Sequence, residues 1–285
     1  MTDASFVLIG IALFGTIVGT YTDLKARLVP DWTNYFMLAS GIGAYAVISA
    51  VEKSIWPIIF SLAGAAIFFA VGLLLYVAGM WGGGDAKLLA AYGAMFAPFP
   101  AVALWPFLFS LWVNILVFGA VIGVIGMLAI FLKNYSKAMP ELKKDFAKNK
   151  FIAYSLAGAG FVSAALSVYK LVFAMILGII ILIFLIMIFR ATERVCLVKR
   201  IKPSQLVEGD WITKEISADK YHYKPKKSGV TKEEIIALIK MENAGKIKEV
   251  EVKDGLPYLP AFLIALIVTL TYGDVFYQIM TNLFL

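Results

Sequence analysis

Two aspartates stand out among the few charged residues of this chain, because each lies directly beside a long apolar stretch. Asp23 follows the first apolar run, and Asp85 follows three consecutive glycines at the start of another. Carboxylates beside membrane helices are costly to bury and are functional candidates by default. Two carboxylates held close together share a proton, because both cannot ionise cheaply. Such a pair could activate water and protonate a scissile carbonyl, which is the chemistry of a two-aspartate protease.

The glycine run at 82–84 would leave space beside the Asp85 carboxylate. Glycines carry no side chain and permit backbone angles closed to other residues, so an extended substrate could approach the backbone closely. Each feature also has a structural interpretation. An aspartate at a helix start is often a cap, and a glycine run is commonly a turn. Asp23 with Lys25 and Arg27 could be a solvated loop, so it is the pairing of the two aspartates that favours function.

The composition narrows the class of protein. Of 285 residues, 61% are hydrophobic and 16% are charged, whereas soluble domains average about 25% charged residues. The mean hydropathy of +0.85 excludes disorder and argues against an ordinary soluble enzyme. A single cysteine, Cys196, excludes an intramolecular disulfide and a CxxC zinc site, and a single histidine, His222, leaves no histidine cluster for a metal. We therefore expect neither a metal nor a cofactor.

The apolar stretches predict a membrane protein, since about 20 apolar residues cross a bilayer core. Stretches without Asp, Glu, Lys, Arg or His occur at 4–22, 32–51, 54–84, 88–132, 151–169, 171–189 and 255–273. The run 88–132 is too long for one span, and its prolines between 98 and 106 divide it into helices at about 86–97 and 102–131. This gives about eight transmembrane helices. Six or seven are possible, because 86–97 is short and 151–169 is rich in small residues.

The basic residues indicate how such helices would be oriented. With the N-terminus outside and eight crossings, 24 of the 26 Lys and Arg residues fall on inner segments, at 23–31, 79–87, 133–150 and 190–254. A single crossing in 151–189 would put the last segment outside, whereas a break at 169–170 favours a hairpin, which keeps that segment inside. The net charge of +7 is then a signal of membrane orientation, and we expect no nucleic-acid partner. Asp23 and Asp85 would both lie at inner helix ends, at one membrane depth.

One segment, at 191–256, has the pattern of a small soluble α+β domain. Its start alternates like short strands, Thr231 with Glu234 forms a capping box for a helix that ends at Gly245, and residues 246–255 alternate again. The fold class is therefore an all-α polytopic membrane protein with this small domain before the last helix. The expected divisions are a catalytic membrane core at 1–132, a basic cytoplasmic loop at 133–150, a transmembrane hairpin at 151–190, the soluble domain at 191–256 and a transmembrane helix at 257–285.

The sequences around both aspartates resemble motifs of a known family. Gly82 and Gly84 supply the glycines, and Asp85 the aspartate, of the GxGD motif of intramembrane aspartyl proteases. The segment Asp23-Leu-Lys-Ala-Arg-Leu-Val-Pro30 resembles the D-x-x-x-R-x-(I/V)-P segment of type IV prepilin peptidases.

Three other residues bear on that resemblance. Arg27 occupies the arginine position of the first motif, and Lys87 fits a common G-D-x-K pattern. Asp31 stands where the family often has Asn, which adds a third carboxylate nearby.

The C-terminal part resembles the archaeal branch of this family, the prepilin and preflagellin (prearchaellin) peptidases. Residues 255–262 read Gly-Leu-Pro-Tyr-Leu-Pro-Ala-Phe, like the segment that precedes the last helix there. Pro257 and Pro260 are either prolines of a helix start or, by similarity to the PAL segment of presenilins, a wall of the active site. The CxxC-containing segment of bacterial members is missing.

The resemblance implies a membrane aspartic endopeptidase of the cell membrane. Its substrates would be prepilin-like or prearchaellin precursors with class III-type signal peptides, which lose a short cationic leader at the cytoplasmic face. Asp23 and Asp85 would be catalytic, and Gly82, Gly84, Arg27, Pro30, Lys87, Pro257 and Pro260 would shape the site or bind substrate. Membrane lipids would surround the helices. No Gly-rich cofactor fingerprint is visible, so we expect proteolysis only.

Two other functions compete with this interpretation. Intramembrane aspartates also serve proton- or cation-coupled secondary transporters, although no inverted repeat is visible in the sequence. A presenilin-like protease of inserted helices would place its first aspartate in a Tyr-Asp pair within a helix, whereas Thr22 precedes Asp23 here.

Overall fold

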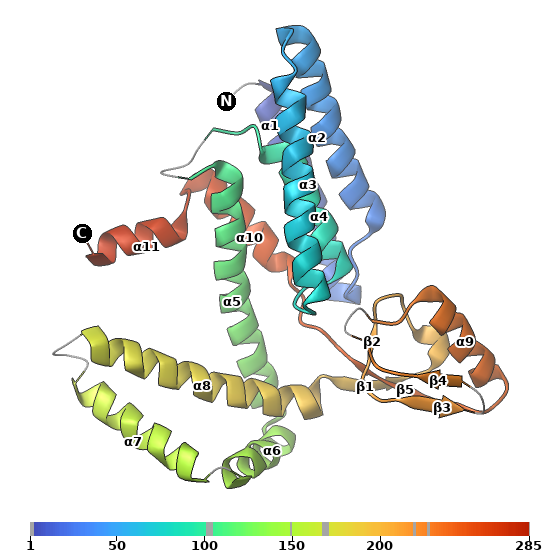
Figure 1. Ribbon diagram of the computed structural model, residues 1–285, viewed down its shortest axis with the longest axis vertical. Helices are drawn as coiled ribbons and strands as arrows, with labels where there is room; N and C mark the ends of the chain where they lie inside the picture. The colour runs from blue at the N-terminus through green and yellow to red at the C-terminus, as the bar shows by residue number, and fades with distance from the viewer. Residues whose placement is uncertain are drawn as a thin grey trace.

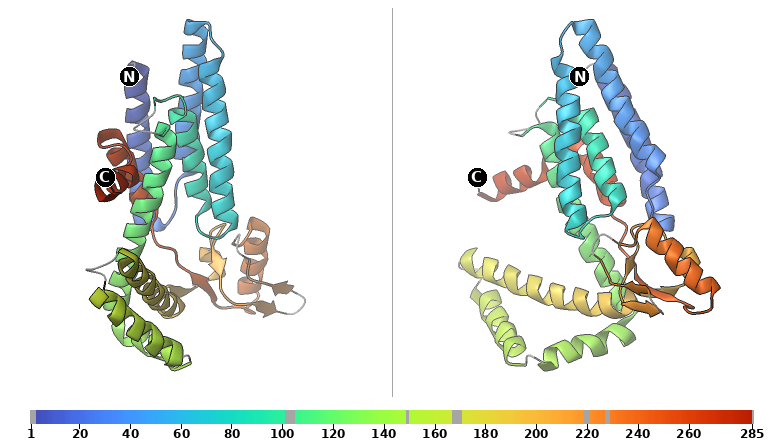
Figure 2. Two further views of the ribbon diagram at one scale, coloured as in Figure 1. Left: turned by 60° about the vertical axis from the view of Figure 1, so that its left-hand side comes forward. Right: turned by 45° about the vertical axis from the view of Figure 1, so that its right-hand side comes forward.

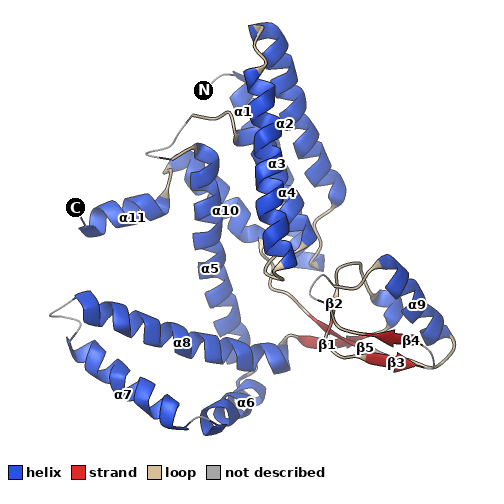
Figure 3. Ribbon diagram, in the orientation of Figure 1, coloured by secondary structure: helices blue, strands red, loops and turns tan. Residues whose placement is uncertain are grey.

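The computed structural model describes residues 3–100, 105–148, 150–166, 171–218, 221–226 and 229–284. These residues form eleven helices and two small sheets (Figures 1 and 3). The helices are α1 (Asp3–Ala26), α2 (Asp31–Glu52), α3 (Trp56–Val77), α4 (Gly83–Phe96), α5 (Phe107–Lys133), α6 (Tyr135–Lys148), α7 (Lys150–Leu166), α8 (Leu171–Cys196), α9 (Lys232–Asn243), α10 (Leu259–Thr271) and α11 (Val275–Phe284). The predicted class, mostly helical with a small α+β region, is confirmed.

Five helices in the described residues are long and apolar enough to cross a membrane. They cover Ala4–Ala26, Asp31–Glu52, Trp56–Val77, Phe107–Lys133 and Ile176–Cys196. The pair α10 and α11 adds a sixth if it is one bent span. The upper count of six agrees with the lower end of the expected six to eight, and the two expected spans that do not reach full length among the described residues are α4 and α7, with 14 and 17 residues. The predicted break at 169–170 lies outside the described residues.

The short helix α4 is enclosed by its neighbours. Eleven of its 14 residues are buried, and it packs between α2 and α3. Gly93 of α4 lies against the backbone of α3 at Gly64, and a Cβ added to either glycine would collide with the other's carbonyl group. Small residues of this kind let membrane helices touch backbone to backbone. At about 21 Å, α4 is shorter than a bilayer core of about 30 Å, but the helices around it shield it.

The last membrane segment is bent rather than a single helix over 257–285. The axes of α10 and α11 differ by 63°. Gly273, with a φ of +83°, ends α10, and the Asp274 carboxylate accepts the Tyr277 N–H at 2.8 Å to cap α11. Asn114 of α5 holds this bend from the side. Its amide group donates to Thr269 Oγ1 and to the Gly273 carbonyl at 2.8 Å each, and its oxygen accepts the Val275 N–H at 3.1 Å.

The segment 133–150, expected as a loop, consists largely of helix α6. Ala138, Leu142 and Phe146 recur every four residues and pack with Phe131 and Ala191. Burial of this apolar stripe explains why a strongly charged segment is helical. Helices α6, α7 and α8 form a second layer, in which α8 lies across the lower end of α5 instead of running beside α1–α4 (Figures 1 and 2).

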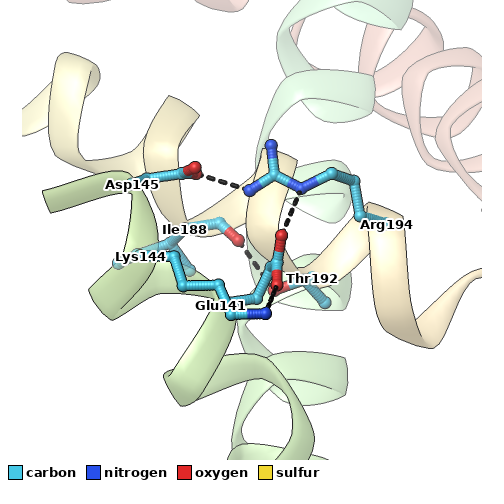
Figure 4. A network of polar contacts seen from close by, with 6 residues as sticks. All are labelled: Glu141, Lys144, Asp145, Ile188, Thr192 and Arg194. Atoms are coloured by element: carbon cyan, nitrogen blue, oxygen red, sulfur yellow. Dashed lines mark hydrogen bonds and ion pairs between the residues drawn. The ribbon is translucent and has the colours of Figure 1, made fainter. Parts of the chain in front are cut away.

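Charged side chains fasten α6 to the end of α8 (Figure 4). Arg194 reaches Glu141 through Nε at 3.3 Å and Asp145 through a terminal nitrogen at 2.5 Å, and Lys144 pairs with Glu141 at 3.1 Å. A single exposed ion pair contributes little, whereas an arginine shared by two carboxylates fixes geometry better. The network therefore orients α8 immediately before the chain enters the soluble module.

The soluble module begins directly after α8. Its strands are β1 (Val198–Ile201), β2 (Trp211–Ile212), β3 (Ile216–Ala218), β4 (Tyr221–Tyr223) and β5 (Val250–Lys253), with a 3-10 turn at Pro203–Gln205. The antiparallel order is β1-β5-β2, and β3 pairs with β4. Its core contains Leu206, Ile212, Tyr223, Val230, Leu238, Val250 and Val252. The predicted capping box of α9 is present, since Glu234 Oε2 accepts the Thr231 N–H at 3.0 Å.

The loops of the helical bundle lie at two opposite ends. The links 27–30 and 78–82 and the soluble module lie at the lower end in Figure 1, and the link 53–55 lies at the upper end. The lower end therefore gathers segments that were expected to share one membrane side.

Candidate active site

Three helix ends meet around Asp23 and Asp85 at the lower end of the bundle. Asp23 lies in the last turn of α1, Asp85 lies in the first turn of α4, and α10 begins beside them (Figure 1). Each aspartate is 8% exposed, and Asp85 lies close enough to Asp23 for their charges to interact. The two carboxylates, which the sequence placed at one membrane depth without showing that they meet, are thus close to each other.

Asp85 is oriented by its own helix start. The Gly82 N–H donates to Asp85 Oδ2 at 2.9 Å, so the carboxylate at the third helical position reaches back to the residue before the helix. This is the capping role that the sequence left open, and it fixes the position of one carboxylate oxygen. A Cβ at Gly82 would lie 3.4 Å from the same Oδ2, which is ordinary contact.

Asp23 is oriented by a segment far away in the sequence. Its Oδ2 accepts the Leu259 N–H at 3.0 Å, and the Thr20 hydroxyl donates to the Leu259 carbonyl at 3.3 Å. Pro260 follows as the second residue of α10. The first N–H groups of a helix have no partner within it, so Asp23 caps α10 from another helix. The prolines at 257 and 260 thus begin a helix and also bring its N-terminus to Asp23.

The two motifs contact each other directly at Gly84. A Cβ added there would lie 2.8 Å from Cβ of Val29 and 2.9 Å from its Cγ2, closer than packed atoms allow. Gly82, Gly83 and Gly84 are not among the described residues with positive φ angles, so the unusual backbone angles that glycine permits are not used here. Gly84 instead leaves space for a neighbouring side chain. Val29, just before Pro30, packs where a side chain on Gly84 would lie.

Asn34 is a site residue that the sequence analysis missed. Its amide donates to the Gly84 carbonyl at 3.3 Å, and its side chain is 1% exposed. It therefore holds the glycine run in place from α2. The only available signal was a polar residue in the first turn after Pro30, within an otherwise apolar helix.

Lys87 and Asp31 form an ion pair at the edge of the site. Lys87 Nζ lies 2.6 Å from Asp31 Oδ1 and 5.7 Å from the centre of the Tyr35 ring. The Asp31 side chain is 57% exposed, so the third carboxylate is engaged outside the buried pair. Glu208 of the soluble module is close enough to interact with the Lys87 charge, which brings the loop between β1 and β2 to the same edge.

Arg27 ends α1 in a left-handed conformation, with a φ of +57°. Its N–H donates to the Asp23 carbonyl at 2.9 Å, which closes the last turn, and its charge interacts with the Asp23 carboxylate. The residue therefore combines a turn that glycine would favour with a cation that glycine lacks.

An aromatic cluster lines the inner side of the pair. The centre of the Trp81 ring lies 5.3 Å from the ring centre of Tyr258 and 5.4 Å from that of Phe262. The ring centres of Tyr92 and Phe262 are 5.9 Å apart. Trp81 directly precedes the glycine run, and Tyr258 lies between the two prolines, so both flank motifs that the sequence did identify. Among the described residues, no group of three or more His, Cys, Asp or Glu side chains is placed to hold a metal ion.

Comparisons with known proteins place the site in a family context. Residues 10–128, which contain both aspartates, match the type IV leader peptidase family. A preflagellin peptidase of Methanococcus voltae is 28% identical over 145 residues, which are 48% of this chain and 62% of that protein. A preflagellin peptidase of Methanocaldococcus jannaschii is 24% identical over 144 residues, or 47% of this chain and 61% of that protein.

A third relative is the prepilin peptidase EppA of Methanothermobacter thermautotrophicus. It is 26% identical over 117 residues, which are 36% of this chain and 30% of that protein. The chain thus spans less than two thirds of each of these relatives. No solved structure matches it significantly.

Proposed function

Because residues 10–128 match the type IV leader peptidase family, we propose that this protein is a membrane endopeptidase for prepilin-like or preflagellin precursors. The names of its relatives, preflagellin peptidase and prepilin peptidase, support this substrate class. The substrate would carry a class III-type signal peptide, and cleavage would release its short cationic leader. The membrane core at 1–132 would perform the chemistry, and the five or six apolar helices would lie among lipids.

Asp23 and Asp85 are the proposed catalytic pair. The ionised member takes a proton from water, the resulting hydroxyl attacks the scissile carbonyl carbon, and the protonated member donates to the carbonyl oxygen. The C–N bond then breaks as a proton passes to the leaving amine. The Gly82 and Leu259 N–H groups support this role, because each fixes one carboxylate oxygen. Asp31 is paired with Lys87 and is not assigned a catalytic part.

The proposed site faces the cytoplasm. The basic inner segments at 23–31, 79–87 and 190–254 gather at the end of the bundle where the aspartates lie, and cytoplasmic loops carry an excess of Lys and Arg. The remaining motif residues, Arg27, Pro30 and Lys87, lie at this end as well.

The observation that carries the proposal is the convergence of Asp23 and Asp85 from two helix ends into one shielded pair. The test replaces each by Asn in isolated membranes and measures leader removal from a preflagellin or prepilin precursor. We expect Asp23→Asn and Asp85→Asn each to lower the rate at least about 10²-fold, as for the loss of an acid–base group. Asp31→Asn is the matched control and should stay active. Full activity after loss of either Asp23 or Asp85 would refute the proposal.

A further inference from the structure

A buried hydrogen bond joins α1 and α4 deeper in the bundle than the aspartates. Thr16 Oγ1 and the Tyr92 hydroxyl lie 2.6 Å apart, and both residues are fully buried. Thr16 precedes Asp23 by seven residues, and Tyr92 follows Asp85 by seven. Seven residues make about two helical turns, so each partner lies on the same face as its aspartate and about 10.5 Å from it along the axis.

The direction of the two helices makes these equal spacings meaningful. α1 runs towards Asp23 at the lower end of the bundle, and α4 runs away from Asp85 at that same end (Figure 1). In two antiparallel helices, a step towards the N-terminus of one helix and an equal step towards the C-terminus of the other lead to positions at the same height. Residues seven before Asp23 and seven after Asp85 are therefore level with each other. The Thr16–Tyr92 hydrogen bond and the Asp23–Asp85 pair are therefore two points of one alignment.

We propose that Thr16 and Tyr92 are positioning residues, which set the axial register of α1 against α4 so that Asp23 faces Asp85. The inference rests on the proposed function of the aspartate pair. A slip of one residue would move a side chain by about 1.5 Å and rotate it by about 100°, which would turn Asp23 away from its partner. Because α1 and α4 approach closely at few of the described positions, this bond is a principal link between them.

The direction of the hydrogen bond follows from counting protons. The Thr16 hydroxyl has one proton and also lies 2.6 Å from the Ala12 carbonyl oxygen, which can only accept. The proton of Thr16 goes to Ala12, so the Tyr92 hydroxyl donates to Thr16. Loss of the Tyr92 hydroxyl therefore leaves Thr16 satisfied, whereas loss of the Thr16 hydroxyl leaves a buried donor without its acceptor.

The Tyr92 ring also connects this position to the aromatic cluster. Its centre lies 5.6 Å from Phe96 and 5.9 Å from Phe262, and Phe262 contacts Trp81 and Tyr258. A phenylalanine at position 92 would keep those ring contacts. Tyr92→Phe therefore removes the hydrogen bond with little change in packing.

The experiment compares Thr16→Val, Thr16→Ser, Tyr92→Phe and the double variant Thr16→Val/Tyr92→Phe. We expect kcat for leader removal to fall about tenfold or more in Thr16→Val and in Tyr92→Phe, since a misplacement of about 1 Å can cost about 10²-fold. Thr16→Ser keeps the acceptor and should keep kcat within about twofold of the wild type. Thermal stability should be lower in Thr16→Val than in Tyr92→Phe and should recover in the double variant, because no donor is then left unpaired.

Comparing kcat with thermal stability in the four variants shows whether Thr16 and Tyr92 set the helix register or only contribute to packing. Recovery of stability without recovery of kcat in the double variant supports the inference. Recovery of both would overturn it, because shape alone would then set the register. If kcat simply follows stability through the four variants, the residues have a structural role only.

A readout without catalysis separates this inference from the proposed function. In a Cys196→Ser background, the variant Asp23→Cys/Asp85→Cys should be linked by a short bifunctional thiol reagent, and the further substitution Thr16→Val should slow the linking several-fold. If Asp23→Asn and Asp85→Asn stay active, the proposed function fails whatever the linking shows. If those variants are inactive, but Thr16→Val and Tyr92→Phe leave both the linking rate of the Asp23→Cys/Asp85→Cys background and the cleavage rate of the wild type unchanged, only the register inference fails.

Discussion

Leu259 donates its backbone N–H to Oδ2 of Asp23 at 3.0 Å, although 236 positions separate the two residues. The contact joins the first membrane helix to the segment that follows the soluble module. It gives the Pro-x-x-Pro sequence a physical task, which is to present the N-terminus of α10 to a carboxylate. The Thr20 hydroxyl holds the carbonyl of the same residue, so both backbone groups of Leu259 bond to α1.

Gly84→Ala should damage the protein, whereas Gly83→Ala should not. A Cβ on Gly84 would overlap Val29, while a Cβ on Gly83 would meet only a Tyr76 ring carbon at 3.9 Å. Overpacking of this kind costs about 1–3 kcal/mol of stability and displaces the backbone beside Asp85. Thermal unfolding and leader removal should both be impaired in Gly84→Ala and recover in Gly84→Ala/Val29→Ala. Failure of the second substitution to rescue would show that the clash with Val29 is not the cause.

Arg27→Gly should be more stable than Arg27→Ala. Both variants lose the cation that interacts with Asp23, but only glycine adopts a φ near +57° without steric cost. The left-handed conformation costs about 1–2 kcal/mol in other residues, so the difference in unfolding free energy should be about 1 kcal/mol. The two variants should lose kcat/KM equally, because they lack the same charge. Equal stabilities would contradict the strained turn described here.

Asn114→Ala should destabilise the protein more than Thr269→Ala. The first change leaves the Gly273 carbonyl and the Val275 N–H without their partner, whereas the second removes one of three contacts. Each buried group left unpaired costs about 1–3 kcal/mol. Unfolding of the detergent-solubilised protein would measure the difference. A larger effect of Thr269→Ala would show that Asn114 does not hold the bend.

The helix α9 should lose protection at acid pH. Burial raises the pKa of Glu234, but hydrogen bonds with Lys226 and Thr231 outweigh it and hold the pKa below its ordinary value of 4.5. A carboxyl with a lowered folded pKa stabilises the fold above its unfolded pKa, and the contribution disappears as pH falls through the folded pKa. Hydrogen exchange of α9 in the full protein should therefore speed up below about pH 4.5. Glu234→Gln should remove most of that pH dependence, and an unchanged dependence would assign it to other groups.

The sequence predicted that Asp23 and Asp85 lie at one end of the bundle, because helix parity places both there, but it could not show that they meet. The capping box at Thr231 and Glu234 was equally accessible, since it depends on residues three positions apart. Such features are local or follow from counting. They do not depend on the exact number of crossings.

The apolar pattern of the sequence could not show which helices are enclosed by other helices. Hydropathy cannot tell that α4 is shielded by other helices and need not be full length, nor that the apolar stripe of α6 packs on α8. The roles of Asn34 and Asn114 depend on partners 50 to 161 positions away. The sequence predicted that the glycine run leaves space, but it could not show that Val29 is the neighbour that fills the space beside Gly84.

The link between β5 and α10 has only five residues, 254–258, and could span no more than about 17 Å even when fully stretched. Its far end is fastened to α1 at Asp23, and the loop between β1 and β2 reaches the charge of Lys87. The module is therefore held near the aspartates, with its β1–β2 loop at the edge of the site beside Lys87. A chain that approaches the pair is confined to the directions that this short tether leaves open.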